Sequence, residues 1–135
     1  MHKDINGEIR GKVSFPTNLT SEEIAHDLNS YIQSAREENK LHIAITSMGT
    51  VGKEVVFGFS AEPIPHKGFL RKKRFVPQCL SIVSAINISD SLPAFLQDQS
   101  KQVRHHFGQG YKLRIIGQTM NEGDSKILVC VLAEK

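Results

Sequence analysis

Residues 40–62 read KLHIAITSMGTVGKEVVFGFSAE, and residues 112–134 read KLRIIGQTMNEGDSKILVCVLAE. Six of the 23 aligned positions are identical at a constant offset of 72 residues, without a gap. Each stretch contains two segments with alternating apolar residues, and a turn separates the two segments. Alternation of this kind is typical of strands that are buried on one face. We therefore predict a β-hairpin in each stretch and a tandem duplication of the unit that contains it.

A strand and a helix precede each hairpin. Thr20 and Glu23 have the spacing of a capping box, so the first helix is expected to begin there. Gly108 suits the left-handed turn after a helix and is expected to end the second. The predicted elements before the hairpins are strands at 8–15 and 80–88 and helices at about 20–38 and 91–108.

The element order predicts an α+β fold in which a β-α-β-β unit occurs twice. The repeats extend over about 6–62 and 79–134, and the whole chain 1–135 is expected to form a single domain. Hairpins are antiparallel, so the sheet is expected to be mostly antiparallel, with the two helices packed on one face.

The connector, residues 63–78, contains three prolines and one glycine, which argue against regular structure. It also contains five of the 17 Lys and Arg residues of the chain and no acidic residue. Without those five, 12 Lys and Arg stand against 14 Asp and Glu. The excess positive charge is therefore local to the connector.

The basic segment, residues 66–75, combines cations with aromatic side chains. Cations can neutralise phosphates, and aromatic rings can stack on unpaired bases, so nucleic acid is one expected partner. An acidic protein partner would also fit, and so would a solvated loop without a partner. The residues of this hypothetical binding site are His66, Lys67, Phe69, Arg71, Lys72, Lys73, Arg74 and Phe75.

The last strand of the second half is apolar on both faces, unlike its counterpart in the first half. A strand of this kind is covered on both faces, either by the rest of the chain or by a second subunit. We expect a homodimer. Its hypothetical interface consists of Ile116, Leu128, Cys130 and Leu132.

Other motifs suggest no chemistry. Gly49–Lys53 resembles a phosphate-binding loop only faintly, and we expect a hairpin turn there. His105 and His106 are adjacent on a helix, so their side chains diverge and are expected to be solvated. Cys79 and Cys130 lie in apolar surroundings and are expected to serve packing. We expect no catalytic residue, metal site or cofactor.

These observations favour a small, non-catalytic, cytosolic binding module that is dimeric. The two cysteines are too few for a disulfide framework, and no run of 18 apolar residues is long enough to span a membrane. One alternative is a nucleic-acid-binding protein that uses the loop 66–75. The other is an enzyme with a site at the interface of the two repeats, although no equivalent residues recur there: His42, for example, aligns with Arg114.

Overall fold

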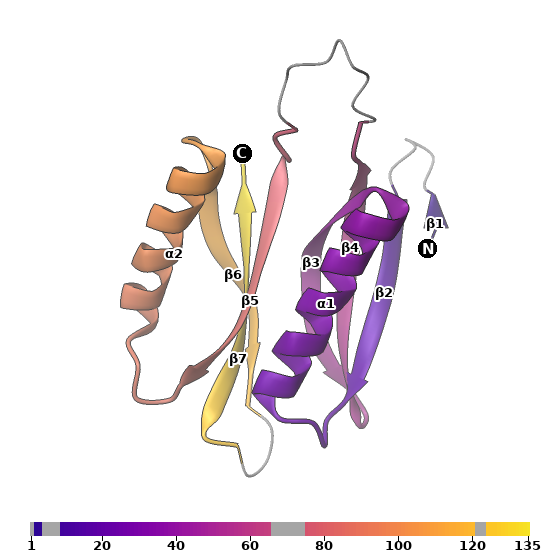
Figure 1. Ribbon diagram of the computed structural model, residues 1–135. Coiled ribbons are helices and arrows are strands. Elements are labelled where there is room, and N and C mark those ends of the chain that lie inside the picture. The colour runs from indigo at the N-terminus through magenta and orange to yellow at the C-terminus, as the bar shows by residue number, and fades with distance from the viewer. Residues whose placement is uncertain (1, 4–8, 66–74, 121–123) are drawn as a thin grey trace.

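The computed structural model describes residues 2–3, 9–65, 75–120 and 124–135 (Figure 1). Within them it confirms an α+β fold with two helices. The first half contains β1 (His2–Lys3), β2 (Ile9–Pro16), α1 (Ser21–Asn39), β3 (Leu41–Val51) and β4 (Glu54–Pro63). The second half contains β5 (Cys79–Asn87), α2 (Leu92–Phe107), β6 (Lys112–Thr119) and β7 (Lys126–Glu134).

The strands form two antiparallel sheets. The first has the order β1-β2-β4-β3, in which β1 contributes two residues, and the second has the order β5-β7-β6. The last strand of each half, β4 or β7, therefore lies between the other two long strands of its half. The sequence predicted the order of the helices and the long strands but not β1, and it left open whether the strands form one mostly antiparallel sheet or two abutting sheets.

A β-bulge occurs at a corresponding place in each hairpin. In the first it lies between Ile45 and Ser47, and in the second between Ile115 and Gly117. After the bulges Ser47 pairs with Gly58, and Gly117 pairs with Cys130. Gly58 of β4 and Cys130 of β7 are 72 residues apart in the sequence. Their partners, Ser47 of β3 and Gly117 of β6, are only 70 residues apart. Strand pairing thus differs from the gapless alignment by two residues.

Helix α1 begins as the sequence predicts. The Glu23 backbone N–H donates to Thr20 Oγ1, and the Thr20 N–H donates to the Glu23 carboxylate, both at 3.1 Å. This reciprocal pair satisfies two backbone donors at the helix start. The face of α1 that contains Ile24, Leu28 and Ala35 is buried in the core.

The start of α1 is also bonded to the second half. Asp124 accepts from the backbone N–H of Ser21 at 2.6 Å and from that of Lys126 at 3.1 Å. The Ser21 hydroxyl, which is fully buried, donates to the carbonyl of Lys126 at 3.2 Å. The hydrogen bond from Ser21 is the largest cause that lowers the pKa of Asp124 below 3.8. One carboxylate therefore connects α1 with the start of β7.

Replacing Asp124 by Ala is expected to lower the free energy of unfolding by about 1 kcal/mol, because the Ser21 N–H loses its acceptor at a helix start. Urea unfolding at neutral pH measures the change. Asp98→Ala, which removes an exposed carboxylate from α2, is the control. Equal midpoints for the two variants would contradict the role given to Asp124.

The two helices lie on opposite faces of the second sheet, so the prediction that both pack on one face is wrong (Figure 1). Leu128 and Cys130 of β7 share a cluster of buried side chains with Leu28 of α1. Ala133 shares a second cluster with Val103 of α2. Successive side chains of a strand point to opposite faces. Since β7 is apolar on both faces, each face needs a cover.

The residues predicted to form a dimer interface are covered by the chain itself. Leu128, Cys130 and Leu132 are exposed by 0%, 0% and 2%, and Ile116 is half-buried against the larger cluster. The doubly apolar strand thus has an intramolecular explanation. A homodimer stays a prediction, and in this structure Leu128, Cys130 and Leu132 are not accessible to a partner.

The halves meet along β3 and β5. The Ile45 N–H donates to the Ser81 hydroxyl, and the Asn29 side chain of α1 donates to the Val83 carbonyl at 3.0 Å. A Cβ atom at Gly117 would lie 2.9 Å from the Met48 side chain, so only glycine permits this approach of β6 to β3. The packing between the halves therefore depends on polar bonds and on a small residue as well as on apolar burial.

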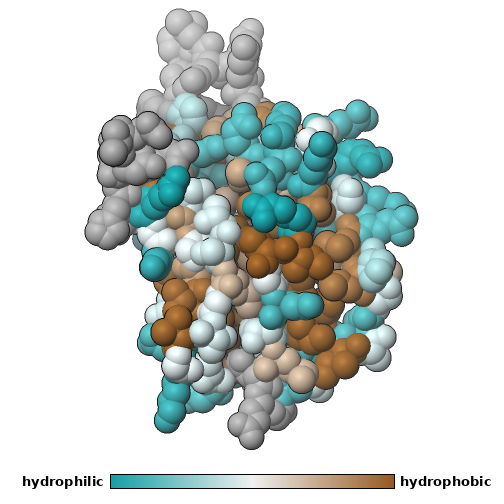
Figure 2. Space-filling model, turned by 180° about the vertical axis from the view of Figure 1, so that it is seen from behind, coloured by the Kyte–Doolittle hydropathy of each residue, from teal (hydrophilic) through white to brown (hydrophobic). Residues whose placement is uncertain are grey.

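The rear of the molecule has a mixed surface. Figure 2 shows hydrophobic residues across its middle and hydrophilic residues toward the end where β4 finishes. The most exposed large hydrophobic side chains among the described residues come from separate segments of the chain: Tyr31, Val51, Val76, Ile88 and Met120.

Candidate functional site

The basic segment 66–75 is the site that the sequence predicts, and most of it lies outside the described residues. His66, Lys67, Phe69, Arg71, Lys72, Lys73 and Arg74 all fall within the range 66–74 that the structure does not describe. Phe75 is described and half-buried. What the structure does show is how the two flanks of the segment, 63–65 and 75–78, contact the body.

Both flanks are bonded to the ends of strands. On the first, the Ile64 N–H donates to the Lys40 carbonyl at 2.8 Å. On the second, the buried Pro77 accepts from the Tyr111 hydroxyl, and Gln78 donates to the Glu62 carboxylate at 3.3 Å. The Lys135 N–H also donates to the Gln78 carbonyl at 2.9 Å. The flanks are therefore held at the end of the sheets where β4 finishes and β5 begins (Figure 1).

His42 is the most buried charged or titratable side chain at this end among the described residues, with 7% exposure. Its Nε2 lies 2.7 Å from the Cys79 carbonyl oxygen, and its Nδ1 lies 3.2 Å from an Arg36 guanidinium nitrogen. A carbonyl only accepts and a guanidinium only donates, so Nε2 bears the proton and Nδ1 accepts. The Phe75 ring packs edge-on against the imidazole, with centroids 5.9 Å apart. We call this group, His42 with Arg36, Phe75 and Cys79, the His42 cluster.

The surroundings of His42 favour its neutral form. Burial is the largest cause that lowers its pKa below 6.5, and the Arg36 guanidinium lowers it further. The hydrogen bond to Cys79 and the charge of Glu62 act in the opposite direction. With Nδ1 facing a cation, a second proton on the ring would be repelled. A neutral imidazole thus connects α1, β3, β5 and the second flank.

Sequence reasoning missed the His42 cluster. Alternation along β3 assigns Leu41, Ile43 and Ile45 to the buried face, which leaves His42 on the face expected to be polar. The residue is buried because β5 and the flank at Phe75 cover that face. No sequence signal marks such a contact, since it joins positions 37 residues apart on strands of different sheets.

Neither thiol is activated. Burial raises the pKa of Cys130 to about 12, in agreement with the expected packing role. Burial also raises the pKa of the half-buried Cys79, and the nearby Glu134 and Glu62 add to that effect. A thiol that stays protonated at neutral pH is a poor nucleophile. Both cysteines are free.

The remaining motifs lie as follows. Gly49–Lys53 is part of a hairpin, as expected, and its loop is Gly52-Lys53, with Gly52 at φ +60°. His105 and His106 are exposed. Their rings contact each other edge to face, with centroids 4.9 Å apart, instead of diverging. Among the described residues, no three His, Cys, Asp or Glu side chains gather closely enough to hold a metal.

Comparison with known proteins found no matching family model, no similar curated protein and no similar solved structure. Within the described part of the chain, neither helix has the length and apolar character needed to cross a membrane.

Proposed function

We propose that this protein is a non-catalytic, cytosolic binding module that contacts nucleic acid through the basic segment 66–75. The observation that carries the proposal is the attachment of both flanks of that segment to the same end of the sheets. The Ile64 N–H donates to the Lys40 carbonyl, and the Pro77 carbonyl accepts from the Tyr111 hydroxyl. Attached ends lower the entropy that a loop loses when it binds a partner.

The charge distribution supports an anionic partner. The segment contains five cations and no acid, while the remainder of the chain is close to neutral. Phe69 supplies a ring of the kind that stacks on bases, whereas the half-buried Phe75 ring packs against His42. The nearby His42 side chain contacts the Phe75 ring of the second flank and the Cys79 backbone carbonyl. Two free thiols fit a reducing compartment.

The test is the binding of single-stranded and duplex oligonucleotides at two salt concentrations. With four phosphate contacts, affinity is expected to fall on the order of 100-fold between about 50 and 200 mM salt. Replacing Arg71, Lys72, Lys73 and Arg74 by Ala is expected to abolish most of the binding. A control with the same charge change replaces exposed lysines elsewhere: Lys12, Lys53, Lys101 and Lys112.

The outcomes separate the alternatives. Binding that survives in the quadruple variant of the segment, or that is lost equally in the control, would overturn the role of the basic segment. If the wild-type protein binds an acidic peptide but neither oligonucleotide, the partner is an acidic protein instead.

We also propose that the two halves arose by tandem duplication of one β-α-β-β unit. The supporting observations are the six identities between the hairpins, the equivalent strand orders β2-β4-β3 and β5-β7-β6, and the β-bulge in each hairpin. The two-residue difference in register lies within the hairpins, where the second connection is longer: β3 ends at Val51 and β4 begins at Glu54, whereas β6 ends at Thr119 and β7 begins at Lys126.

A further inference from the structure

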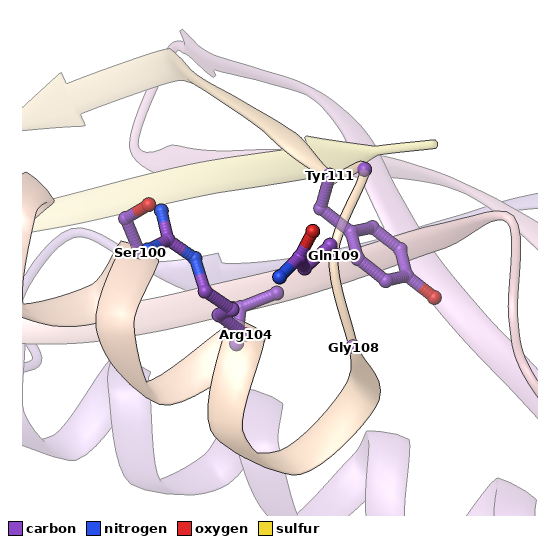
Figure 3. A pocket seen from close by; sticks show the side chains of 7 residues that line it. Ser100, Arg104, Gly108, Gln109 and Tyr111 are labelled. Atoms are coloured by element: carbon purple, nitrogen blue, oxygen red, sulfur yellow. The ribbon is translucent and has the colours of Figure 1, made fainter.

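A cavity lies beside the C-terminal end of α2 (Figure 3). Helix α2 itself lies on the side of the second sheet away from α1 (Figure 1). Its volume is about 280 Å³. The lining comes from the last two turns of α2 and from the loop that leads into β6: Ser100, Val103, Arg104, Gly108, Gln109, Gly110 and Tyr111. Ligand sites in proteins begin at roughly 300 Å³, so the space suits a small molecule.

The polar side chains of the lining include three that can donate hydrogen bonds: Ser100, Arg104 and Gln109. Figure 3 shows the Arg104 guanidinium beside the Ser100 hydroxyl and the Gln109 amide on the opposite side of the cavity. Within the described residues, the side chains of Ser100, Arg104 and Gln109 have no hydrogen-bond or ion-pair partner. The lining contains no carboxylate. A ligand with several acceptor oxygens would therefore meet free donors.

The loop owes its shape to two glycines. Gly108 and Gly110 both have φ +102°, a conformation that other residues rarely adopt. The Gly108 N–H makes the last helical bond, to the Arg104 carbonyl, and the positive φ of Gly108 then ends the helix. An added Cβ at Gly108 would meet nothing within 4 Å, so the cavity is open at this point. The two glycines thus turn the chain away from α2 and leave the cavity between the helix and the loop.

A second cation lies at the rim. The Lys135 stem passes Gly110, where an added Cβ would lie 3.8 Å from Lys135 Cγ. The Lys135 Nζ lies 5.6 Å from the centroid of the Tyr111 ring. Lys135 lies outside the lining, so Arg104 supplies the positive charge within it. The Arg104 guanidinium offsets the partial negative charge that the C-terminal end of a helix contributes.

We propose that this cavity binds the phosphate group of a small molecule. Arg104 is the main ligand-binding residue, because its planar fork donates two parallel hydrogen bonds to an oxyanion. Ser100 and Gln109 donate to the remaining oxygens, and Val103, which is 6% exposed, forms an apolar floor. The phosphate is favoured over a carboxylate because donors from three residues border the space and a phosphate group offers more acceptor oxygens.

The test is a titration with inorganic phosphate, followed by amide NMR shifts at constant ionic strength. The wild-type protein is expected to show saturable shifts confined to residues 100–111 and 135. Arg104→Ala is expected to weaken binding at least tenfold, since a charge-assisted pair is lost. Lys101→Ala, which removes an exposed cation of the same helix outside the lining, is expected to stay within twofold of the wild type.

Acetate at the same ionic strength is the second arm and is expected to bind more weakly than phosphate. The proposal is overturned if Arg104→Ala binds phosphate as the wild type does, if the shifts do not saturate, or if Lys101→Ala loses as much affinity as Arg104→Ala. Acetate binding equal to phosphate would overturn the choice of ligand. The quadruple variant of residues 71–74 is expected to bind phosphate normally, so failure of the nucleic-acid proposal leaves this one standing.

Discussion

Replacing Leu128 by Ala is expected to lower the free energy of unfolding by about 2–5 kcal/mol, the range for a fully buried leucine. Leu128 lies on the central strand of the second sheet and belongs to the cluster that joins both halves. Removing its side chain leaves a cavity between α1 and β7. This cavity does not collapse, because the strand is closely packed on both faces. Urea unfolding followed by circular dichroism measures the loss.

The control is Ile88→Ala, because Ile88 is 53% exposed and follows β5. Its effect is expected to stay within about 0.5 kcal/mol. The same experiment tests what covers β7. If the chain alone covers Leu128, Cys130 and Leu132, the midpoint of unfolding does not depend on protein concentration. A midpoint that rises with concentration would show that the folded protein self-associates.

Replacing His42 by Phe is expected to cost about 1–3 kcal/mol, because the Cys79 carbonyl loses its donor in a buried place. Phenylalanine keeps the ring contact with Phe75, so the loss reports the two hydrogen bonds rather than the aromatic packing. The variant also leaves the Arg36 guanidinium without its contact to Nδ1. Unfolding in urea at about pH 7.5 measures the difference from the wild type.

The pH dependence of stability has a definite sign at His42. Burial holds its pKa below 6.5 in the folded protein, so the unfolded chain takes up the proton first as the pH falls. Stability is therefore complete above the unfolded-state value, decreases as the pH drops below 6.5, and levels off below the folded-state pKa. His42→Phe is expected to lose this part of the pH dependence.

His26→Ala serves as the control for the pH experiment, since His26 is exposed on α1. It is expected to keep the decrease in stability between neutral and mildly acid pH. An unchanged pH profile in His42→Phe would contradict the assignment of a neutral, buried imidazole. Hydrogen exchange of the amides at 75–78 would show in addition whether the second flank opens when His42 is replaced.

Local patterns predicted the elements well. The capping box at Thr20 and Glu23 occurs as expected, and Gly108 ends α2. The hairpin at Gly49–Lys53 also occurs, because its alternating flanks decide the strands and a glycine permits the turn. These features depend on residues within a few positions of one another, so a single sequence contains the information for them.

The candidate sites were harder to predict from the sequence than the helices and strands. The sequence drew attention to the basic segment because its charge is unusual, whereas His42 and Arg104 stand in ordinary amphipathic patterns. His42 becomes significant only through Cys79 and Phe75, and Arg104 only through the loop that passes Gly108 and Gly110. Both depend on which segments meet in space.

By itself, the sequence determined the α+β class, the order of the strands and helices, the caps, the turns and the apolar character of both faces of β7. Only the tertiary structure decided what covers that strand: α2 on one face and α1 with the core of the first half on the other. The physical reason is that burial of apolar surface is non-directional. The pattern of Leu128–Ala133 requires a cover on each face but does not specify which element supplies it.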